Sequence, residues 1–525
     1  MTSSPLAPTR GSLIVAGACP GALTPLRSGV LQGRRGRVAV PTYDRSALTP
    51  SVIHIGVGGF ARAHQLVYFD DIAQRRISNQ WGVLGVGLHS RALQNALAPQ
   101  DYLYLVVERD AEQERARIIG SLVGYRFAPE DPGATLAALS EPSARLVTLT
   151  ITGNGYGIDP QTGEFDPDDA EVQADLRHPD RPSGALGFLV AALDRRRRAG
   201  LPPFTVLSCD NIQHNGRAAR TAVVAFARLR DEVLARWITD NVAFPGSMVD
   251  RITPQTTPEV RAAIADVFGV DDRWPVVTEP FSQWVVEDTF CNGRPPLDQV
   301  GARFASDVRP YELMKTRLLN ASHCALGYLG RLAGYTHVHE ALADSVLRGY
   351  TARLMDEEVS PLLPPVHGVD LADYTRTLLQ RLANPVLGDR LERLCDRGST
   401  KMPSYLLPSL HEAVRRARPH ALLTLAVAAW CRYLRGLEPA GNPTGVRDPR
   451  GAELQALAIA GGDLDPRPLL GERSIFGDLG GNPCFVDAVA AALGRLERDG
   501  VRPTIAAYTS RHVHPAPGEA SGASA

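Results

Sequence analysis

The stretch SVIHIGVGGFARAH, residues 51–64, decides the fold of the N-terminal half of this 525-residue chain. Apolar residues recur up to Ile55, which predicts a strand. Gly56 and Gly58 follow at once, and residues 65–75 then carry a helical pattern. A strand, a glycine turn and a helix in this order form the first unit of a doubly wound α/β sheet.

The glycine turn has the spacing Gly-x-Gly-x-x-Ala, which is typical of dinucleotide-binding folds when it lies between a strand and a helix. Gly56 permits the tight turn, and Gly58 lets backbone N–H groups approach a pyrophosphate at the start of the helix. The alternative is a turn that serves only helix–strand packing. We expect cofactor contacts from Gly56, Gly58, Gly59, Phe60 and Arg62.

The end of the second predicted strand, residues 82–88, leaves the identity of the cofactor open. An NAD site usually has Asp or Glu at this point to bind the ribose 2′-hydroxyl group. This chain has His89, Ser90 and Arg91 instead. NAD is the expected cofactor, with NADP as the alternative.

Strands and helices alternate along the first 300 residues, which predicts an α/β, Rossmann-type domain. Further strands are predicted at 102–108, 117–123, 146–152 and 204–208, and helices at 133–139, 184–198 and 216–237. Residues 153–180, rich in Gly, Asp and Pro, are predicted to form a loop.

Pro295 and Pro296 mark the expected domain boundary near residue 300, and beyond Tyr311 the pattern is almost wholly helical. Helices are predicted at 315–333, 341–358, 371–383, 390–396 and 410–436. We therefore expect a dinucleotide-binding domain over 39–300 and a mostly α-helical substrate and catalytic domain over 301–511. Residues 1–38 and the tail 512–525 are expected to be disordered.

The composition excludes several classes of function. A net charge of −1 argues against a nucleic-acid partner and against binding to a membrane surface. The seven cysteines lack zinc-site spacing, which fits reduced thiols in a cytoplasmic protein. Cys209 and Asp210 have no third ligand at suitable spacing, so no metal site is predicted.

Only two of the 56 Lys and Arg residues are lysines, Lys315 and Lys401. Lysine differs from arginine because a buried ammonium can lose its proton. Lys315 lies in an apolar helical segment, and burial lowers a lysine pKa towards neutrality, so it is a candidate general base. Asn320 and His323 follow at about 140° and about 80° around an α-helix and can border the same pocket. The alternative is a helix whose polar residues only cap or pair.

Two further candidates follow predicted strands. Asn211 ends the segment LSCDN, residues 207–211, and its amide can donate to a carbonyl oxygen. Asp250 lies at a second strand end and can orient a site. A surface salt bridge between Asp250 and Arg251 is the alternative for this carboxylate.

Five ordered segments together resemble the mannitol dehydrogenase family, the polyol-specific long-chain dehydrogenases. The segments are 55–64; 208–211 with Asn215 and Gly216; 248–254; Glu279 and Pro280 with Gln283 and Trp284; and Lys315 with Asn320 and His323. The resemblance covers about residues 40–500. It implies a Rossmann-type domain, a helical domain and NAD(P)-linked, metal-independent chemistry.

The resemblance also implies roles for the matching residues. Lys315 matches the catalytic base, and Glu312 matches a carboxylate that relays protons between this base and solvent. Asn211 and Asn320 match the pair that polarises the reacting oxygen. His323 matches a residue that binds and orients the substrate.

Three other residues match substrate-side positions of the family. Asp250 is one, and Arg393 and Lys401 match positions that bind the hydroxyl groups of the substrate. The chain departs from the family at Thr152-Gly153, where Thr-Glu is common, and in the missing acid after the second strand. Both departures concern the preference for a cofactor.

The resemblance implies an enzyme that interconverts a polyol and a 2-keto sugar, in the first place D-mannitol and D-fructose. The alternatives are a fructuronate reductase (D-mannonate oxidoreductase) and a D-arabinitol dehydrogenase. A non-catalytic nucleotide-binding sensor is the alternative from another class. The expected partner is a small-molecule polyol or keto sugar, and the expected assembly is a monomer or a weak homo-oligomer.

Overall fold

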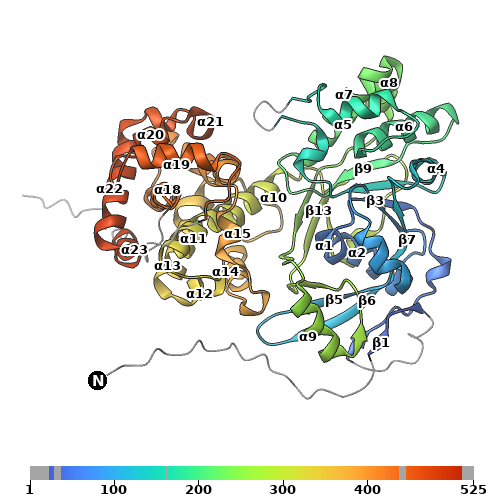
Figure 1. Cartoon of the computed structure of the whole chain (residues 1–525), viewed down its shortest axis with the longest axis horizontal. Helices are drawn as coiled ribbons and strands as arrows, with labels where there is room; N and C mark the ends of the chain where they lie inside the picture. The colour runs from blue at the N-terminus through green and yellow to red at the C-terminus, as the bar shows by residue number, and fades with distance from the viewer. Residues whose placement is uncertain (1–22, 29–36, 160–163, 437–444, 511–525) are drawn as a thin grey trace, which may run out of the picture.

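A five-stranded parallel sheet forms the centre of the N-terminal domain in the computed structural model, which describes residues 23–28, 37–159, 164–436 and 445–510 (Figure 1). The strand order is β7-β4-β3-β8-β9. These strands are β3 (Val52–Ile55), β4 (Val83–Gly87), β7 (Leu122–Phe127), β8 (Leu146–Leu149) and β9 (Thr205–Ser208). The predicted α/β Rossmann-type fold class is confirmed.

The residues of β3 alternate between the two faces of this sheet, and helices bury both faces. Ile53 and Ile55 pack with α4 (Pro132–Ser140), α6 (Ala185–Arg198) and α7 (Asn215–Arg230). Val52 packs on the opposite face with α2 (Gln65–Gln74). Burial on both faces is the reason why β3 is apolar at nearly every position.

Three segments of this domain differ from the sequence prediction. The strand predicted at 117–123 is two strands, β6 (Glu114–Ile119) and β7, because the chain passes from one sheet to another at Gly120. The helix predicted at 216–237 is broken at Asp231, which caps α8 (Glu232–Asn241). The loop predicted at 153–180 contains η4 (Gly153–Tyr156) and α5 (Ala170–Arg177), which Asp169 caps.

The first domain also contains a four-stranded and a three-stranded sheet. One has the order β12-β5-β6-β2 and the other β10-β13-β14. Their strands are β2 (Val38–Ala39), β5 (Tyr104–Arg109), β10 (Ser247–Asp250), β12 (Val276–Thr278), β13 (Gln283–Glu287) and β14 (Arg303–Ala305). The short helices α1 (Gly59–Ala63) and α3 (Ala92–Leu97) and the longer α9 (Pro258–Phe268) complete the domain.

Part of the expected N-terminal extension is ordered. Strand β1 (Thr24–Pro25) pairs in parallel with β11 (Val270–Asp271), and Leu26 is buried. The ordered chain therefore begins ahead of residue 39. The remainder of residues 1–36 and the expected tail 512–525 lie outside the described residues.

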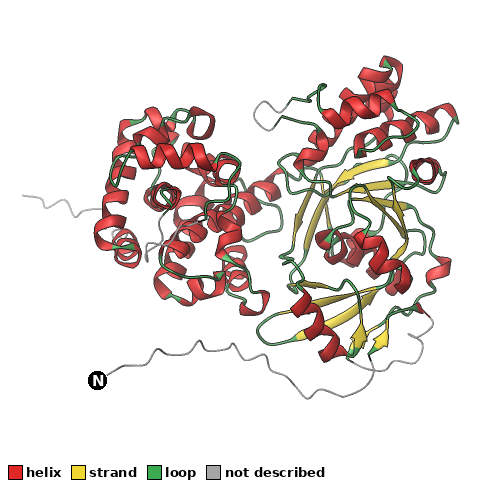
Figure 2. Cartoon of the chain, in the orientation of Figure 1, coloured by secondary structure: helices red, strands yellow, loops and turns green. Residues whose placement is uncertain are grey.

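The C-terminal domain is built from helices, as predicted (Figure 2). Its longer elements are α10 (Arg309–Met314), η6 (Lys315–Asn320), α11 (Ala321–Leu332), α12 (Val338–Ala343), α13 (Ser345–Arg353), η7 (Leu354–Val359), α14 (Leu371–Leu382), α15 (Leu391–Cys395), η10 (Met402–Leu406), α17 (Leu407–Arg415), α18 (Ala421–Leu434), α19 (Gly451–Ala460), α22 (Pro483–Asp499) and α23 (Val501–Ser510). Short elements lie between them, namely α16 (Gly398–Lys401), α20 (Arg467–Leu470) and α21 (Arg473–Phe476).

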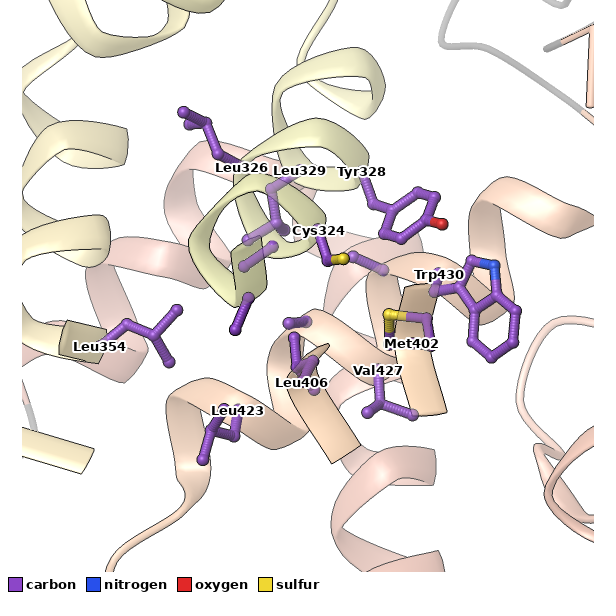
Figure 3. Close-up of a cluster of buried hydrophobic side chains, with 14 of the residues drawn as sticks. Cys324, Leu326, Tyr328, Leu329, Leu354, Met402, Leu406, Leu423, Val427 and Trp430 are labelled. Carbon is purple, nitrogen blue, oxygen red and sulfur yellow. The ribbon is translucent and has the colours of Figure 1, made fainter. Parts of the chain in front are cut away.

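Helix α18 is the centre of this domain because it is buried on all sides. Figure 3 shows side chains of α11 and α18, among them Tyr328 and Trp430, packed in one apolar cluster. The helix predicted at 410–436 is divided into α17 and α18, since Ala417 has a φ of 50° and Pro419 follows. The helix predicted at 341–358 is broken at Asp344, which caps α13.

Within the described residues, no helix is both long enough and apolar enough to span a membrane.

Candidate active site

A cleft of about 610 Å³ lies where the strand ends of the first domain face the helices of the second. The first domain contributes the glycine turn, Thr150, Thr152, Gly153 and the loops 209–212 and 249–255. The second contributes Lys315, Leu319, Asn320, His323, Asp389 and Arg393. Most of the expected site residues thus meet in one cleft, although they come from distant parts of the chain.

The glycine turn is adapted to a bound group. Gly56 has a φ of +93°, and a Cβ atom there would lie 2.2 Å from the carbonyl oxygen of Thr150, so no other residue fits. Gly58 caps α1, whose first N–H groups have no partner within the helix. Gly56, Gly58, Gly59 and Phe60 line the cleft. These residues fit the pyrophosphate of a dinucleotide.

The side chain of Arg62 lies away from the cleft, contrary to the expected cofactor contact. It donates a hydrogen bond to the carbonyl oxygen of Trp274, and its guanidinium group lies 5.3 Å from the centre of the Tyr104 ring. Arg62 is 2% exposed. Arg62 therefore packs between α1 and the sheet that contains β5.

Lys315 is buried at the start of η6, a π-helical turn. Its Nζ atom donates to Asn211 Oδ1 and to the carbonyl oxygen of Val249, each at 2.7 Å. Burial lowers the pKa of this amine, the charge of Asp250 opposes the effect, and the charge of Arg381 adds to it. In a π-helix the hydrogen bonds join residues five apart, so each turn contains more residues than a turn of an α-helix. Asn320 therefore lies at a smaller angle from Lys315 around the helix axis than it would on the α-helix that the sequence predicted.

Three side chains present hydrogen-bonding groups to the cleft beside Lys315. Asn211 uses its oxygen to accept from Lys315, which leaves its NH₂ group free to donate to another molecule. Asn320 Nδ2 and His323 Nε2 are buried and have no hydrogen-bond partner among the described residues. Burial lowers the pKa of His323 to about 3, so its imidazole is neutral at physiological pH. Unpaired buried polar atoms that line a cleft indicate a polar ligand.

Asp250 has a partner that no sequence pattern indicated. It pairs with Arg381 of α14, and both side chains are 5% exposed or less. The alternative of a surface salt bridge with Arg251 is wrong, because Arg251 is buried and pairs with Glu108. Arg381 lies within an ordinary amphipathic helix, and its sequence context carries no signal of this contact.

Glu312 lies behind Lys315, between two cavities. A small cavity of about 30 Å³ is bordered by both Glu312 and Lys315, and an open one of about 290 Å³ is bordered by Glu312 and His214. His214 Nδ1 is 3.5 Å from the Glu312 carboxylate. Burial raises the pKa of Glu312 to about 7, so this group can both bind and release a proton near neutral pH.

The two expected hydroxyl-binding residues behave differently. Arg393 lines the cleft and pairs with Asp389 through two hydrogen bonds of 2.7 and 2.6 Å. Lys401 does not line the cleft; it donates to the carbonyl oxygens of Arg393 and Leu394 at 2.8 and 3.2 Å. Lys401 therefore holds the end of the helix that carries Arg393, and a direct substrate contact from Lys401 is not supported.

The segment after β4 is open at the surface. Arg91 forms a salt bridge with Glu130, and each side chain is about half exposed. Glu108, near the end of β5, pairs with Arg251. Asp110 accepts from the backbone N–H groups of Glu112 and Gln113 in its own turn.

No group of three or more His, Cys, Asp or Glu residues in the described ranges could hold a metal ion. A glycine turn at the edge of a parallel sheet, facing a buried lysine and amide donors, is typical of a dinucleotide-dependent dehydrogenase.

Comparisons with known proteins agree with this class. A family model described as the mannitol dehydrogenase Rossmann domain matches residues 50–299, and one described as the mannitol dehydrogenase C-terminal domain matches residues 307–497. The chain therefore belongs to the mannitol dehydrogenase family.

The relatives are similar over nearly their whole length. Mannitol 2-dehydrogenase of Phaeosphaeria nodorum is 46% identical over 477 residues, which cover 90% of this chain and 83% of the relative. That of Emericella nidulans is 44% identical over 488 residues, which cover 91% and 97%.

Two solved structures have the same two-domain fold. Pseudomonas fluorescens mannitol 2-dehydrogenase, in a ternary complex with NAD and D-mannitol, has a TM-score of 0.85 and 41% identity, covering 93% of this chain and 100% of that chain. A D-sorbitol dehydrogenase in substrate-free form has a TM-score of 0.85 and 35% identity, covering 91% and 100%.

Proposed function

We propose that this protein is an NAD-linked dehydrogenase that interconverts D-mannitol and D-fructose. The observation that carries the proposal is the contact set of Lys315, which presents a buried amine to a cleft with a dinucleotide-binding turn at its other end. The relatives are named mannitol 2-dehydrogenases, which favours D-mannitol over the D-mannonate and D-arabinitol alternatives. A non-catalytic sensor has no use for a buried lysine in this position.

The hydrogen bonds of Lys315 determine how it acts as a base. A neutral amine has two N–H donors and one lone pair. Both donors are engaged, one by Asn211 and one by the carbonyl oxygen of Val249. The lone pair is then free to accept the proton of a substrate hydroxyl group in the cleft. Bound NAD supplies the hydride acceptor.

The amide groups of Asn211 and Asn320 stabilise the oxygen as it loses its proton. Each can donate a hydrogen bond from a position that lines the cleft beside Lys315. A preorganised donor of this kind typically contributes about 3 kcal/mol to lowering the barrier. His323 and Arg393 orient the substrate through its other hydroxyl groups. Asp250 also lines the cleft and lies on the substrate side of the site.

The proton leaves the site through Glu312. This carboxyl group borders one cavity with Lys315 and another with His214, so water in the two cavities would connect the base to solvent. Its pKa of about 7 allows it to pass a proton in either direction of the reaction.

We further propose that the enzyme is cytoplasmic, independent of metal ions, and a monomer or a weak homo-oligomer. Six free cysteines among the described residues support a reducing compartment. Lys315 accepts the hydroxyl proton and the two amides stabilise the oxygen, a task that a zinc ion performs as a Lewis acid in other dehydrogenases.

Initial rates with a panel of substrates test the proposed function. D-Mannitol, D-sorbitol, D-arabinitol and D-mannonate are each assayed with NAD⁺ and with NADP⁺, and D-fructose with the reduced cofactors. We expect the highest kcat/KM for D-mannitol. A higher kcat/KM for D-mannonate would identify a fructuronate reductase instead, and no turnover with any substrate would favour the sensor.

A further inference from the structure

Arg381 of α14 connects the two domains at the back of the cleft. Its guanidinium group donates to both oxygens of Asp250, at 2.8 and 2.9 Å. It also donates to both oxygens of Glu279, at 3.0 and 2.8 Å. The three side chains are at most 5% exposed. One buried cation from the helical domain therefore serves two buried carboxylates from the Rossmann-type domain.

The surroundings hold Arg381 in one orientation. Its guanidinium group lies 3.8 Å from the centre of the Phe281 ring, close enough for a cation–π contact. Glu279 is fixed in turn, because it also accepts from the backbone N–H group of Ile252 at 2.6 Å. A guanidinium group with two bidentate partners in a dry site has little freedom to reorient.

This cluster lies next to the proposed base. Asp250 follows Val249, whose carbonyl oxygen accepts from Lys315 at 2.7 Å. The charged groups that act on Lys315 are Asp250, Arg381 and Glu312. His64 and His323, which also face this region, are neutral because burial lowers the pKa of each to about 3. The charge state of Lys315 is therefore governed by burial and by these three side chains. Glu279 acts on Lys315 only indirectly, because its carboxylate pairs with Arg381 and offsets part of the charge of that guanidinium group.

We propose that Arg381 is a positioning residue of the active site, which holds Asp250 in place beside Lys315 and offsets its negative charge. The inference rests on the proposed function of Lys315 as a base. If Arg381 were absent, the negative charges of Asp250 and Glu279 would favour the ammonium form of Lys315, which cannot accept a proton. With Arg381 in place, Lys315 loses its proton at a lower pH. Arg381 reaches Asp250 only when α14 is docked against the first domain.

Two substitutions test the charge effect in opposite directions. Arg381→Gln removes the compensating cation, so we expect the pKa of Lys315 to rise by about one pH unit. Glu279→Gln removes one anion and keeps the pair of Arg381 and Asp250, so we expect the pKa of Lys315 to fall. Glu279 does not line the cleft, which separates this effect from substrate binding.

The scarcity of lysine allows a direct measurement on the full-length protein. Labelling with ¹³C,¹⁵N-lysine gives side-chain signals from only two residues, Lys315 and Lys401, and Lys401→Arg assigns them. The pH titration of the Lys315 signal is then followed in the wild type and in each variant. Arg376→Gln is the matched control, because Arg376 is on the same helix but pairs with Asp373 at the surface.

The proposal predicts a higher Lys315 pKa in Arg381→Gln, a lower one in Glu279→Gln and no change in Arg376→Gln. An unchanged Lys315 titration in Glu279→Gln would overturn it, even if Arg381→Gln does not fold. The same displacements should appear in the pH profile of kcat for polyol oxidation. A wild-type protein that titrates as expected but oxidises no polyol would contradict the proposed function and leave the role of Arg381 intact.

Discussion

The amine of Lys315 donates to the side-chain oxygen of Asn211 at 2.7 Å, and this hydrogen bond crosses the boundary between the two domains. Lys315 begins the π-helical turn of the helical domain, whereas Asn211 follows the last strand of the parallel sheet. The proposed base and an amide that lines the cleft are thus fixed relative to each other. In the proposed mechanism, this one contact couples proton transfer to stabilisation of the oxygen.

Loss of the base should abolish most of the activity. We expect Lys315→Ala to lower kcat by at least about 10³-fold, because general-base assistance disappears. Lys315→Arg should restore little, since a guanidinium group stays protonated. Steady-state rates with D-mannitol measure both variants.

The same change at the other lysine is the matched comparison. The kcat of Lys401→Arg should be at least about tenfold higher than the kcat of Lys315→Arg. The reason is that Lys401 only donates to backbone carbonyl oxygens, which arginine can also do. If Lys315→Arg keeps most of the wild-type rate, the base is another group.

Removal of divalent metal ions should not affect catalysis. Prolonged dialysis against a chelator is expected to leave kcat and KM unchanged, whereas a zinc-dependent dehydrogenase loses activity. Metal analysis of the active protein provides the second measurement. One equivalent of zinc in active enzyme would count against the proposed mechanism.

Discrimination between the two cofactors should be weak. The segment after β4 has no acid to bind the ribose 2′-hydroxyl group and repel a 2′-phosphate. We expect NAD⁺ to be accepted and NADP⁺ to be used with a kcat/KM no worse than about a tenth of that for NAD⁺, a difference of about 1.4 kcal/mol. A preference for NAD⁺ above about a thousandfold would refute this prediction.

The salt bridge between Arg91 and Glu130 gives a sharper form of the cofactor test. Glu130→Gln releases Arg91 from its partner and should raise kcat/KM for NADP⁺, since a free guanidinium group can pair with the 2′-phosphate. Arg91→Ala should lower the NADP⁺ rate and leave the NAD⁺ rate nearly unchanged. No response of the NADP⁺ rate to Arg91→Ala would show that another group faces the phosphate.

Glu358 should make the stability of the helical domain depend on pH. It is buried under α18, where its carboxylate accepts from the N–H groups of Leu422 and Leu423 at 2.8 Å each. Burial outweighs these hydrogen bonds and raises the pKa of Glu358 to about 7. The folded state then binds the proton more tightly than the unfolded state. The resulting stabilisation is complete below the ordinary pKa of 4.5 and is lost as the pH rises through about 7.

Thermal melting at pH 5 and pH 8 measures this effect. Between these values the wild type should lose on the order of 2 kcal/mol more stability than Glu358→Gln, whose side chain does not titrate. Glu357→Gln is the control, because Glu357 is exposed and pairs with Arg353 at the surface. Equal changes of Tm with pH in the wild type and in Glu358→Gln would contradict the prediction.

Local patterns were sufficient for the fold class and for most of the residues that line the cleft. Residues 51–64 contain the strand, the turn and the helix start next to one another, and each depends on contacts within a few residues. Gly56 must be glycine because of its own φ angle, and Lys315 was conspicuous because lysine is rare in this chain. Chemistry that a short segment carries by itself can be predicted from that segment.

Side-chain directions and distant partners could not be predicted in this way. Arg62 follows the glycine turn, yet it points away from the cleft, and Lys401 holds a helix end instead of lining the cleft. The breaks at Asp231 and Asp344 depend on where a capping carboxylate meets free N–H groups.

The sequence by itself determined the two-domain fold, the dinucleotide-binding turn and the lysine suited to act as a base, because periodicity, glycine geometry and residue chemistry are local properties. Only the tertiary structure decided that Asn211 accepts from Lys315 and that Arg381 holds Asp250 and Glu279. These pairs are separated by more than a hundred residues in the chain. Docking of the two domains buries these pairs together, and we propose that this sets the charge of Lys315.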